Sequence, residues 1–129
     1  MSLTIIENGH IAGSLSTVPI LSVNDVTASR ALSTIYTNNT GKTLIITISI
    51  RHYSGNEAAN KAYTDLFTIP QSGGSPVHML SGIYQNFPTN SGVYSTPTLL
   101  VKPGDQYILG EVLAGNLASN TIIYWIESY

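Results

Sequence analysis

The sequence predicts an all-β protein, an antiparallel two-sheet β-sandwich of about seven to eight strands with a jelly-roll-like arrangement. Extended segments recur roughly every 10–15 residues, and turns rich in Gly, Pro and Asn separate them. No stretch of ten residues carries the apolar stripe of a helix. No internal repeat of fixed period is visible, which argues against a solenoid or a propeller. The 129 residues are expected to form one domain, with residues 1–16 as a candidate N-terminal arm.

The clearest strand signal lies in residues 32–53. From residue 44 onward, Leu44, Ile46, Ile48 and Ile50 occupy alternate positions and mostly polar residues lie between them, a period of two. The preceding residues 37–42 are rich in Asn and Gly, which tolerate the left-handed backbone of a tight turn. We therefore expect a central hairpin here, a strand, a polar turn and a longer strand running back.

Further strands are expected on both sides of this segment. Residues 4–7 end at the Asn8-Gly9 turn signal and form either a hairpin with residues 10–15 or an arm on a neighbouring subunit. Pro19 places residues 17–26 at a sheet edge or in a loop, because proline lacks the ladder N–H. Residues 76–97 form either two short strands or a long ordered loop. The remaining strands are expected at residues 62–69, 98–101, 106–113 and 121–127, with a type II turn at residues 102–105.

The composition excludes several kinds of partner. Charged residues make up 9% of the chain, the formal net charge is −2, and the basic residues are scattered. We therefore expect no nucleic-acid partner and no anionic membrane surface. No apolar run is long enough to span a membrane, and the N-terminus lacks the basic region of a signal peptide. The many Ser, Thr and Asn residues are typical of extracellular or virion β-proteins and suit contact with neutral sugars.

Neither the histidines nor the nucleophiles form a catalytic pattern. His10, His52 and His78 lie on different segments without metal-ligand spacing, so each is expected at the surface or in an interface. There is no cysteine, and no Gly-x-Ser-x-Gly motif. We expect no metal and no cofactor.

The carboxylates also have structural explanations. Asp105 belongs to a turn, and Glu111 and Glu127 lie at strand ends, so a pair for glycoside hydrolysis is not indicated. The pattern Asn38-Asn39-Thr40 matches the N-glycosylation signal, but its residues are also those of a turn, which is the interpretation we adopt. The sequence thus predicts no catalytic residues and a protein that is not an enzyme.

Aromatic residues mark the candidate binding site. Tyrosine and phenylalanine rings can stack on the CH groups of a sugar while nearby amides bind its hydroxyls. The predicted ligand-binding residues are Tyr84, Gln85, Asn86, Phe87, Asn90 and Tyr94. The alternative is that these rings close one end of the core or pack between subunits. Tyr107, Tyr124 and Trp125 alternate within strands and are expected to be architectural.

Three short motifs occur in a fixed order along the chain: YTNNTGK at residues 36–42, VKPGDQY at residues 101–107 and YWIE at residues 124–127. This order resembles the C-terminal β-domains of tailed-bacteriophage tail fibres, spikes and related virion proteins. Two positions depart from the family pattern, since Thr43 and Lys102 stand where proline is usual. Residues 54–97 match no part of that pattern.

The resemblance implies a β-sandwich that assembles as a homotrimer in the virion and serves as a non-catalytic receptor-binding tip. The receptor it implies is a host cell-surface glycan, with no insertion into the membrane. Two alternatives stay open. One is a purely structural domain for assembly, trimerisation or capsid decoration, and the other is a small carbohydrate-binding module or enzyme unrelated to phage.

Overall fold

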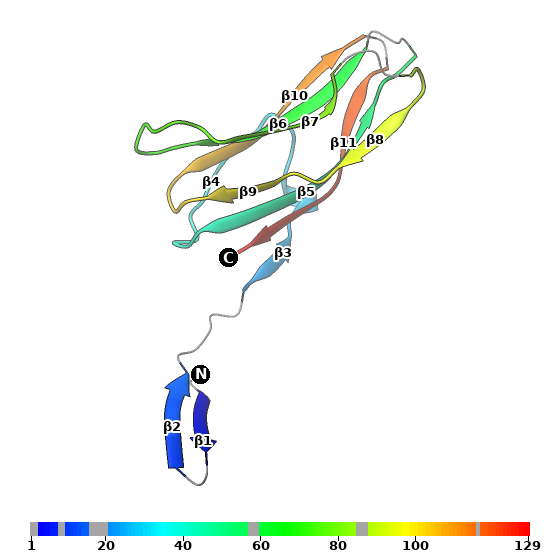
Figure 1. Cartoon of the computed structure of the whole chain (residues 1–129). Helices are drawn as coiled ribbons and strands as arrows, with labels where there is room; N and C mark the ends of the chain where they lie inside the picture. Colours follow the sequence, from blue (N-terminus) through cyan, green and yellow to red (C-terminus); the bar gives the residue numbers. More distant parts are fainter. Residues whose placement is uncertain (1–2, 8–9, 16–20, 57–59, 85–87, 116) are drawn as a thin grey trace.

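The computed structural model describes residues 3–7, 10–15, 21–56, 60–84, 88–115 and 117–129. Two antiparallel sheets of five and four strands face each other across one hydrophobic core (Figure 1). Within the described residues the only helical element is one 3-10 turn, η1 (Thr27–Ser29). The predicted all-β sandwich is confirmed.

The five-stranded sheet is built around its longest strands, β5 and β11, which run side by side. On the other side of β5, β8 and β9 follow one another along the same edge. Pro97 separates these two short strands, and its carbonyl accepts a hydrogen bond from the Ile48 N–H at 3.2 Å. The strands of this sheet are β3 (Val23–Asp25), β11 (Ser119–Ser128), β5 (Leu44–Tyr53), β8 (Gly92–Ser95) and β9 (Thr98–Val101).

The four-stranded sheet has the order β4-β10-β6-β7. The nine-residue strands β10 and β6 form its centre and pair along their whole length. The short strand β4 and the strand β7 form its two edges. The bounds are β4 (Ile35–Thr37), β10 (Gln106–Ala114), β6 (Lys61–Ile69) and β7 (His78–Ile83).

The strand order is that of a jelly roll, in which two Greek keys share two sheets. With β8 and β9 counted as one interrupted strand, the sandwich has eight strands, in agreement with the predicted seven to eight. The chain passes from one sheet to the other at each connection from β3 to β11, except between β6 and β7 and at the break between β8 and β9. Neighbours in sequence are therefore mostly not neighbours in a sheet.

The predicted hairpin in residues 32–53 is wrong. Both strands exist, but β4 pairs with β10, whereas β5 pairs with β11, β8 and β9. The polar loop between them therefore carries the chain across the sandwich. Tyr36 and Leu44, before and after the loop, both pack in the core. The loop residues specify a change of direction, but they do not specify whether the next strand pairs with the last one or faces it.

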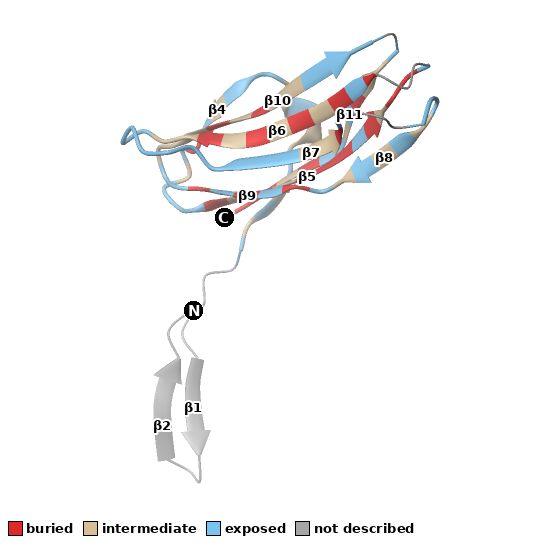
Figure 2. Ribbon diagram, turned by 45° about the horizontal axis from the view of Figure 1, so that its top comes forward, coloured by how far each residue is buried: buried red, intermediate tan, exposed pale blue. Residues whose placement is uncertain are grey.

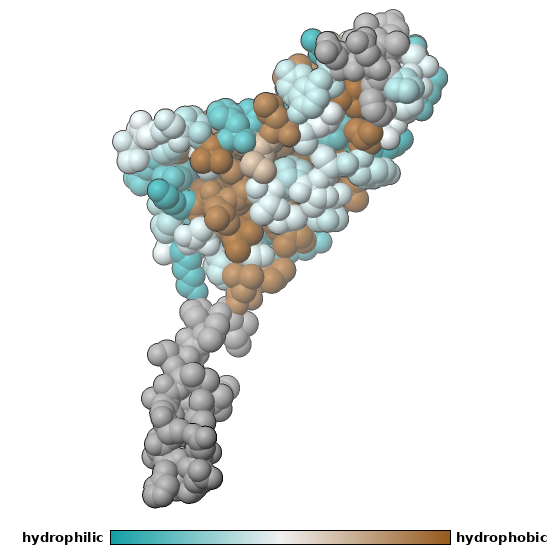
Figure 3. Space-filling view, viewed as in Figure 1, coloured by the Kyte–Doolittle hydropathy of each residue, from teal (hydrophilic) through white to brown (hydrophobic). Residues whose placement is uncertain are grey.

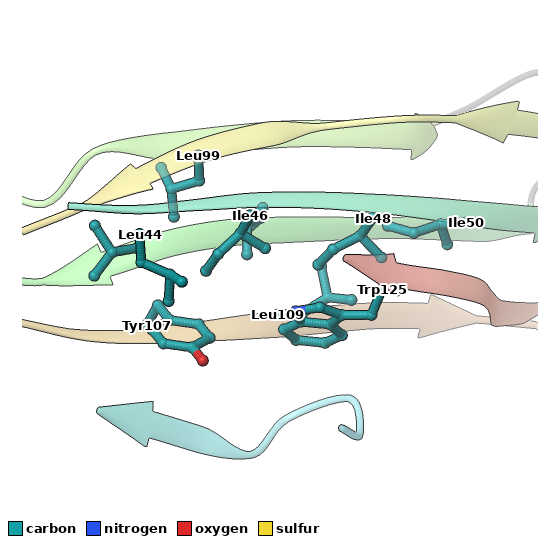
Figure 4. Packing of buried hydrophobic residues seen from close by; sticks show 10 residues of the cluster. Leu44, Ile46, Ile48, Ile50, Leu99, Tyr107, Leu109 and Trp125 are labelled. Atoms are coloured by element: carbon teal, nitrogen blue, oxygen red, sulfur yellow. The ribbon is translucent and has the colours of Figure 1, made fainter. Parts of the chain in front are cut away.

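The core confirms the alternation found in β5. Leu44, Ile46, Ile48 and Ile50 are buried on its inner face, and Figure 2 shows the same alternation of buried and less buried positions along β6. Burying each such side chain contributes about 1.5–3 kcal/mol. Opposite them lie Leu66, Tyr107 and Leu109 of the four-stranded sheet, and Leu99, Val101 and Trp125 complete the cluster (Figure 4).

The other predicted strands and the predicted turn at residues 102–105 are found where the structure describes the residues. β1 (Leu3–Glu7) pairs with β2 (His10–Leu15) as a separate two-stranded sheet, which confirms the hairpin. Pro19 lies outside the described residues, and β3 is an edge strand as expected. Residues 76–97 contribute two short strands, β7 and β8. Gly104 has φ +83°, and Asp105 N donates to Lys102 O at 3.1 Å, which confirms the type II turn.

Candidate functional site

Aromatic rings from all three sequence motifs meet in the interior. Ring centroids lie 5.7 Å apart for Tyr36 and Tyr107, and 5.9 and 6.5 Å apart for Trp125 with each of these two. Contacts of this kind contribute about 0.5–1.5 kcal/mol beyond area burial. Tyr107 and Trp125 are buried, so their predicted architectural role is confirmed. The motifs that carry the resemblance therefore share one packing role.

An ion pair adjoins these rings. Arg30 donates through Nε and Nη2 to both carboxylate oxygens of Glu127, at 2.8 and 2.9 Å, and the Tyr107 hydroxyl donates to Oε1 at 2.7 Å. The Arg30 guanidinium lies 4.5 Å from the centroid of the Tyr36 ring. Burial raises the pKa of the Tyr107 hydroxyl, and the hydrogen bond to Glu127 raises the pKa of the guanidinium. We call these four residues the Arg30 cluster. A pocket of about 470 Å³ adjoins it, but the cluster's charges are already paired with each other.

The Asn38 side chain is part of the scaffold. It is buried, and its Nδ2 donates to the carbonyls of Lys42 and Val101 at 2.8 and 2.9 Å. Its Oδ1 accepts from the backbone N–H and the hydroxyl of Thr40 at 3.0 and 2.7 Å. Both donors and both lone pairs are thus engaged. In this fold the residues of the glycosylation pattern form the hydrogen bonds of a turn, as we predicted.

A line of polar side chains connects the two sheets around His52. Its Nδ1 lies 2.7 Å from Asn120 Oδ1, and its Nε2 lies 2.6 Å from Ser95 Oγ. Ser95 Oγ is in turn 3.0 Å from Ser81 Oγ. Because Asn120 Nδ2 donates to Tyr63 O at 3.2 Å, its Oδ1 must face the imidazole. This arrangement makes Nδ1 the donor and Nε2 the acceptor.

This line has the order of a nucleophile, a base and an orienting group, but not the access that catalysis needs. His52 has 0% exposed surface, and burial lowers its pKa below the ordinary value, so the ring is neutral at pH 7. A substrate has no approach to the imidazole side of Ser95. The line is a structural link among β5, β7, β8 and β11. The expectation that His52 lies at the surface or in an interface was wrong, because the alternation of β5 places it inward.

The other two histidines lie elsewhere. His78 is on the outer face of the four-stranded sheet, where its Nδ1 is 2.6 Å from Asp65 Oδ2 and its ring stacks on Phe67 with centroids 4.9 Å apart. It is exposed, as predicted. His10 is the first residue of β2. Among the described residues, no three His, Cys, Asp or Glu are placed to hold a metal ion.

The strongest candidate for a binding site is an exposed cluster on the outer face of the five-stranded sheet. Tyr94 on β8 is 68% exposed and lies directly opposite Arg51 on β5. The Arg51 guanidinium lies 5.4 Å from the centroid of the Tyr53 ring, and the Tyr53 hydroxyl donates to Asn90 Oδ1 at 3.0 Å. We call these four residues the Arg51 cluster. It brings a ring, a guanidinium and an amide to one surface.

The turn that carries Asn90 is bonded to the end of β5. The Ser54 hydroxyl donates toward Pro88 O at 2.8 Å and Ser91 O at 3.1 Å, and it accepts from Ser91 N at 3.2 Å. Asn90 N donates to Gly55 O at 2.6 Å. Asn90 itself has φ +53°, a conformation that asparagine tolerates better than most residues. Backbone and side-chain bonds together therefore fix the amide.

A glycine makes room for the guanidinium. Gly92 lies opposite Tyr53 on the neighbouring strand, next to the Arg51–Tyr94 pair. A Cβ on Gly92 would lie 3.3 Å from Arg51 Nε, tighter than most real contacts. The arginine side chain thus lies over the backbone of β8, and the register of β5 and β8 sets its position.

The structure separates the residues that the sequence grouped into one site. Tyr84 follows β7, is 43% exposed and stacks with centroids 4.9 Å apart on Tyr63, on the outer face of the four-stranded sheet. Tyr94 and Asn90 lie on the outer face of the other sheet. The remaining predicted site residues, Gln85, Asn86 and Phe87, lie outside the described residues. Tyr84 and Tyr94 therefore do not form a single surface.

Sequence reasoning missed Arg51 and Tyr53. Their signal was present, because both occupy the face of β5 opposite its buried leucine and isoleucines. Tyr124, expected to be architectural, lies on the same outer face opposite Ser49 and is 38% exposed. What the sequence did not show is which other strand would lie beside Arg51.

Among the described residues, no helix has the length and apolar character needed to cross a membrane. Comparison of the chain with protein-family models, with curated proteins and with solved structures finds no match.

Proposed function

We propose that this chain is a non-catalytic receptor-binding domain of a bacteriophage or prophage virion, at the tip of a fibre or spike, and that it binds a glycan on the host cell. The observation that supports the binding role is the Arg51 cluster. It is exposed, and strand pairing and hydrogen bonds hold its members in place. Such preorganisation lowers the entropy that a ligand must overcome on binding.

The cluster has the groups that a sugar requires. The Tyr94 ring offers an exposed face on which the CH groups of a pyranose can stack. Asn90 Oδ1 accepts from Tyr53, which leaves the Nδ2 group to donate to a sugar hydroxyl. The surface is open rather than enclosed, so each site binds weakly. A homotrimer compensates for this by presenting three sites to the same cell surface.

The motif resemblance and the topology support the virion assignment. One aromatic ring from each of the three motifs packs in the same interior cluster, so the motifs contribute to one structural unit. Jelly rolls recur in viral capsid and lectin domains. The likeness to virion proteins lies in the fold and in the three motifs. We propose on this basis that the protein belongs to the phage particle and is made in the bacterial cytoplasm.

Two exposed tyrosines on opposite faces of the sandwich test the site. Labelled protein would be incubated with a panel of bacterial strains and with their extracted lipopolysaccharides, and bound protein measured. We expect Tyr94→Ala to reduce binding about five-fold or more, since stacking on an aromatic ring is worth roughly 1 kcal/mol. Tyr84→Ala is the matched control, and we expect it to bind like the parent protein.

The opposite result for the two tyrosine variants would place the binding site on the other sheet. If Tyr84→Ala abolished binding and Tyr94→Ala did not, the site would lie on the four-stranded sheet. If the parent protein bound none of the cells or lipopolysaccharides, the receptor-binding role would be wrong for that panel's surface chemistry. Release of sugar from the lipopolysaccharides would contradict the non-catalytic assignment.

A second candidate function is assembly without a ligand, and one observation favours it. The sheets open between their edge strands β7 and β9, where an apolar pocket of about 540 Å³ is lined in part by Val77, Met79, Leu99 and Leu100. Figure 3 shows hydrophobic side chains gathered over the face of the sandwich that carries β9. Exposed apolar surface beside open strand edges is typical of a subunit interface.

Light scattering tests the assembly role. We expect the parent protein to be a trimer and the double substitution of the exposed Val77 and Leu100 by serine to shift it toward monomer. A monomeric parent protein would overturn both the trimer and the assembly function. A trimer that survives the double substitution would place the interface elsewhere.

A further inference from the structure

The Arg51 guanidinium carries a charge that no described residue neutralises. Within the described part of the chain there are two ion pairs, Arg30 with Glu127 and His78 with Asp65. The first adjoins the interior aromatic cluster, and the second lies on the outer face of the four-stranded sheet. Arg51 is exposed and has no carboxylate partner in that part of the chain. Its charge is therefore available to a ligand from solvent.

The immediate neighbours of Arg51 across the sheet are uncharged. Tyr94 lies opposite it on β8, and Thr121 lies opposite it on β11. Gly92 leaves space for the side chain over the backbone of β8, and the Tyr53 ring packs near the guanidinium. The guanidinium thus lies near the Tyr53 ring and beside the backbone of β8, the strand that carries the exposed Tyr94.

We propose that the ligand of this site is a carboxylate-bearing sugar, a hexuronic or a sialic acid. Guanidinium and carboxylate groups match in a two-bond geometry that a hydroxyl cannot reproduce. The carboxylate is bound by Arg51, the sugar ring stacks on Tyr94, and a ring hydroxyl accepts from Asn90 Nδ2. This inference rests on the glycan-binding function proposed above.

The arrangement favours an acidic sugar over the neutral sugars that the composition suits. An arginine left unpaired on an open β-surface adds little to stability, so its structural value does not explain why the fold makes room for it. A polyphosphate or nucleic acid would need several basic groups. At this position Arg51 on β5 pairs with one residue on β8 and one on β11, and neither of these two is basic. One guanidinium beside one ring fits one acidic sugar unit.

The expected contribution of the charge is modest because the site is open. An exposed ion pair changes affinity by up to about five-fold, and salt weakens it. Stacking on Tyr94 contributes for acidic and neutral sugars alike. Arg51 is therefore expected to determine how much better an acidic sugar binds than a neutral one. Tyr94 is expected to determine how strongly both kinds of sugar bind.

An oligosaccharide array tests this division. It would carry glycans containing hexuronic or sialic acid, each beside its carboxyl-reduced neutral counterpart, with sulfated glycans included. We expect the parent protein to bind the acidic member of a pair about five-fold better, and 0.5 M NaCl to remove that preference. Arg51→Gln is expected to bind both members equally, and Tyr94→Ala to bind both members about five-fold less well than the parent protein while keeping the acid preference. Tyr84→Ala serves as the control on the opposite face.

The outcomes separate this inference from the function on which it rests. If acidic and reduced glycans bind equally through Tyr94, the carboxylate inference fails and the glycan-binding function stands. A preference for sulfated glycans, or an acid preference that persists in Arg51→Gln, also overturns the carboxylate assignment. If no glycan on the array is bound, both proposals fail.

Discussion

The described part of the chain contains two arginine–tyrosine contacts, and they differ in whether a carboxylate also binds the arginine. Arg30 lies 4.5 Å from the Tyr36 ring centroid, and Arg51 lies 5.4 Å from that of Tyr53. Arg30 is bound at both ends of its fork by the buried Glu127, whereas Arg51 is exposed and has no carboxylate partner among the described residues. An arginine–tyrosine contact thus stabilises the fold in one place, and in the other it is exposed and can bind a ligand.

This difference shows how burial changes the value of a charge. Removing one member of a buried pair leaves the other charge without solvent or partner, which is strongly destabilising. An exposed arginine keeps its hydration, so its removal has little effect on folding. The stability of the fold should therefore depend on the Arg30 cluster, and ligand recognition should depend on the Arg51 cluster.

The largest expected effect is the loss of Arg30. We expect Arg30→Ala to lower the free energy of unfolding by about 3 kcal/mol, because Glu127 is then buried and unpaired. Arg51→Ala is the matched control, and its effect should stay within about 0.5 kcal/mol. Urea unfolding followed by tryptophan fluorescence measures both, since Trp125 reports on the core. Equal losses in the two variants would abolish the distinction between the clusters.

The next effect concerns pH and extends the comparison along β5, where Arg51 faces solvent and the adjacent His52 faces inward. Burial lowers the pKa of His52 in the folded state, so the unfolded chain binds the proton more readily. Stability contributed by the neutral ring is fully present above about pH 6.5 and is lost as pH falls below that value, by up to about 1.4 kcal/mol per pH unit.

Unfolding curves at pH 7.5 and pH 5 check this expectation. The parent protein should lose more stability on acidification than His52→Gln, in which the buried ring is gone. Both measurements are best made in a His78→Asn background, because His78 also faces a carboxylate, that of Asp65. If both proteins had the same pH dependence, His52 would not be the titrating group.

A smaller effect is expected at Asn90, whose φ of +53° is strained for most side chains. Asn90→Ala should cost about 1 kcal/mol of stability, whereas Asn90→Gly should stay within about 0.5 kcal/mol. Both variants lack the amide, so both should bind glycan less well. Thermal unfolding combined with the binding assay separates the two contributions. Full binding by Asn90→Gly would exclude the amide from the site.

The smallest effect is expected for Tyr53→Phe, which removes only the hydroxyl that donates to Asn90 Oδ1. The bond is exposed, so its loss should lower stability by no more than about 0.5 kcal/mol. The Asn90 amide is then free to rotate, and we expect glycan binding to fall about two-fold. A calorimetric titration with the best glycan from the array measures this change. Unchanged binding would show that the backbone alone orients the amide.

Local patterns in the sequence predicted the strands well and the binding surface only in part. The alternation in β5 gave its inner and outer faces, and the turn at Lys102–Asp105 followed from Pro103 and Gly104. Tyr94 and Asn90 were recognised as candidates because exposed aromatic and amide groups have a clear chemical meaning. Arg51 was counted only as one scattered charge, since its neighbours Tyr94 and Thr121 lie far away in the sequence.

The hairpin in residues 32–53 and the grouping of Tyr84 with Tyr94 failed for the same reason. A turn sequence determines the local backbone angles, and alternation determines which side chains share a face, because both depend on neighbouring residues. Which strands pair, and which surfaces therefore coincide, depends on burying all the apolar faces together. In a jelly roll most consecutive strands lie in different sheets, so only the assembled core brought Arg51 beside Tyr94 and placed Tyr84 on the opposite face.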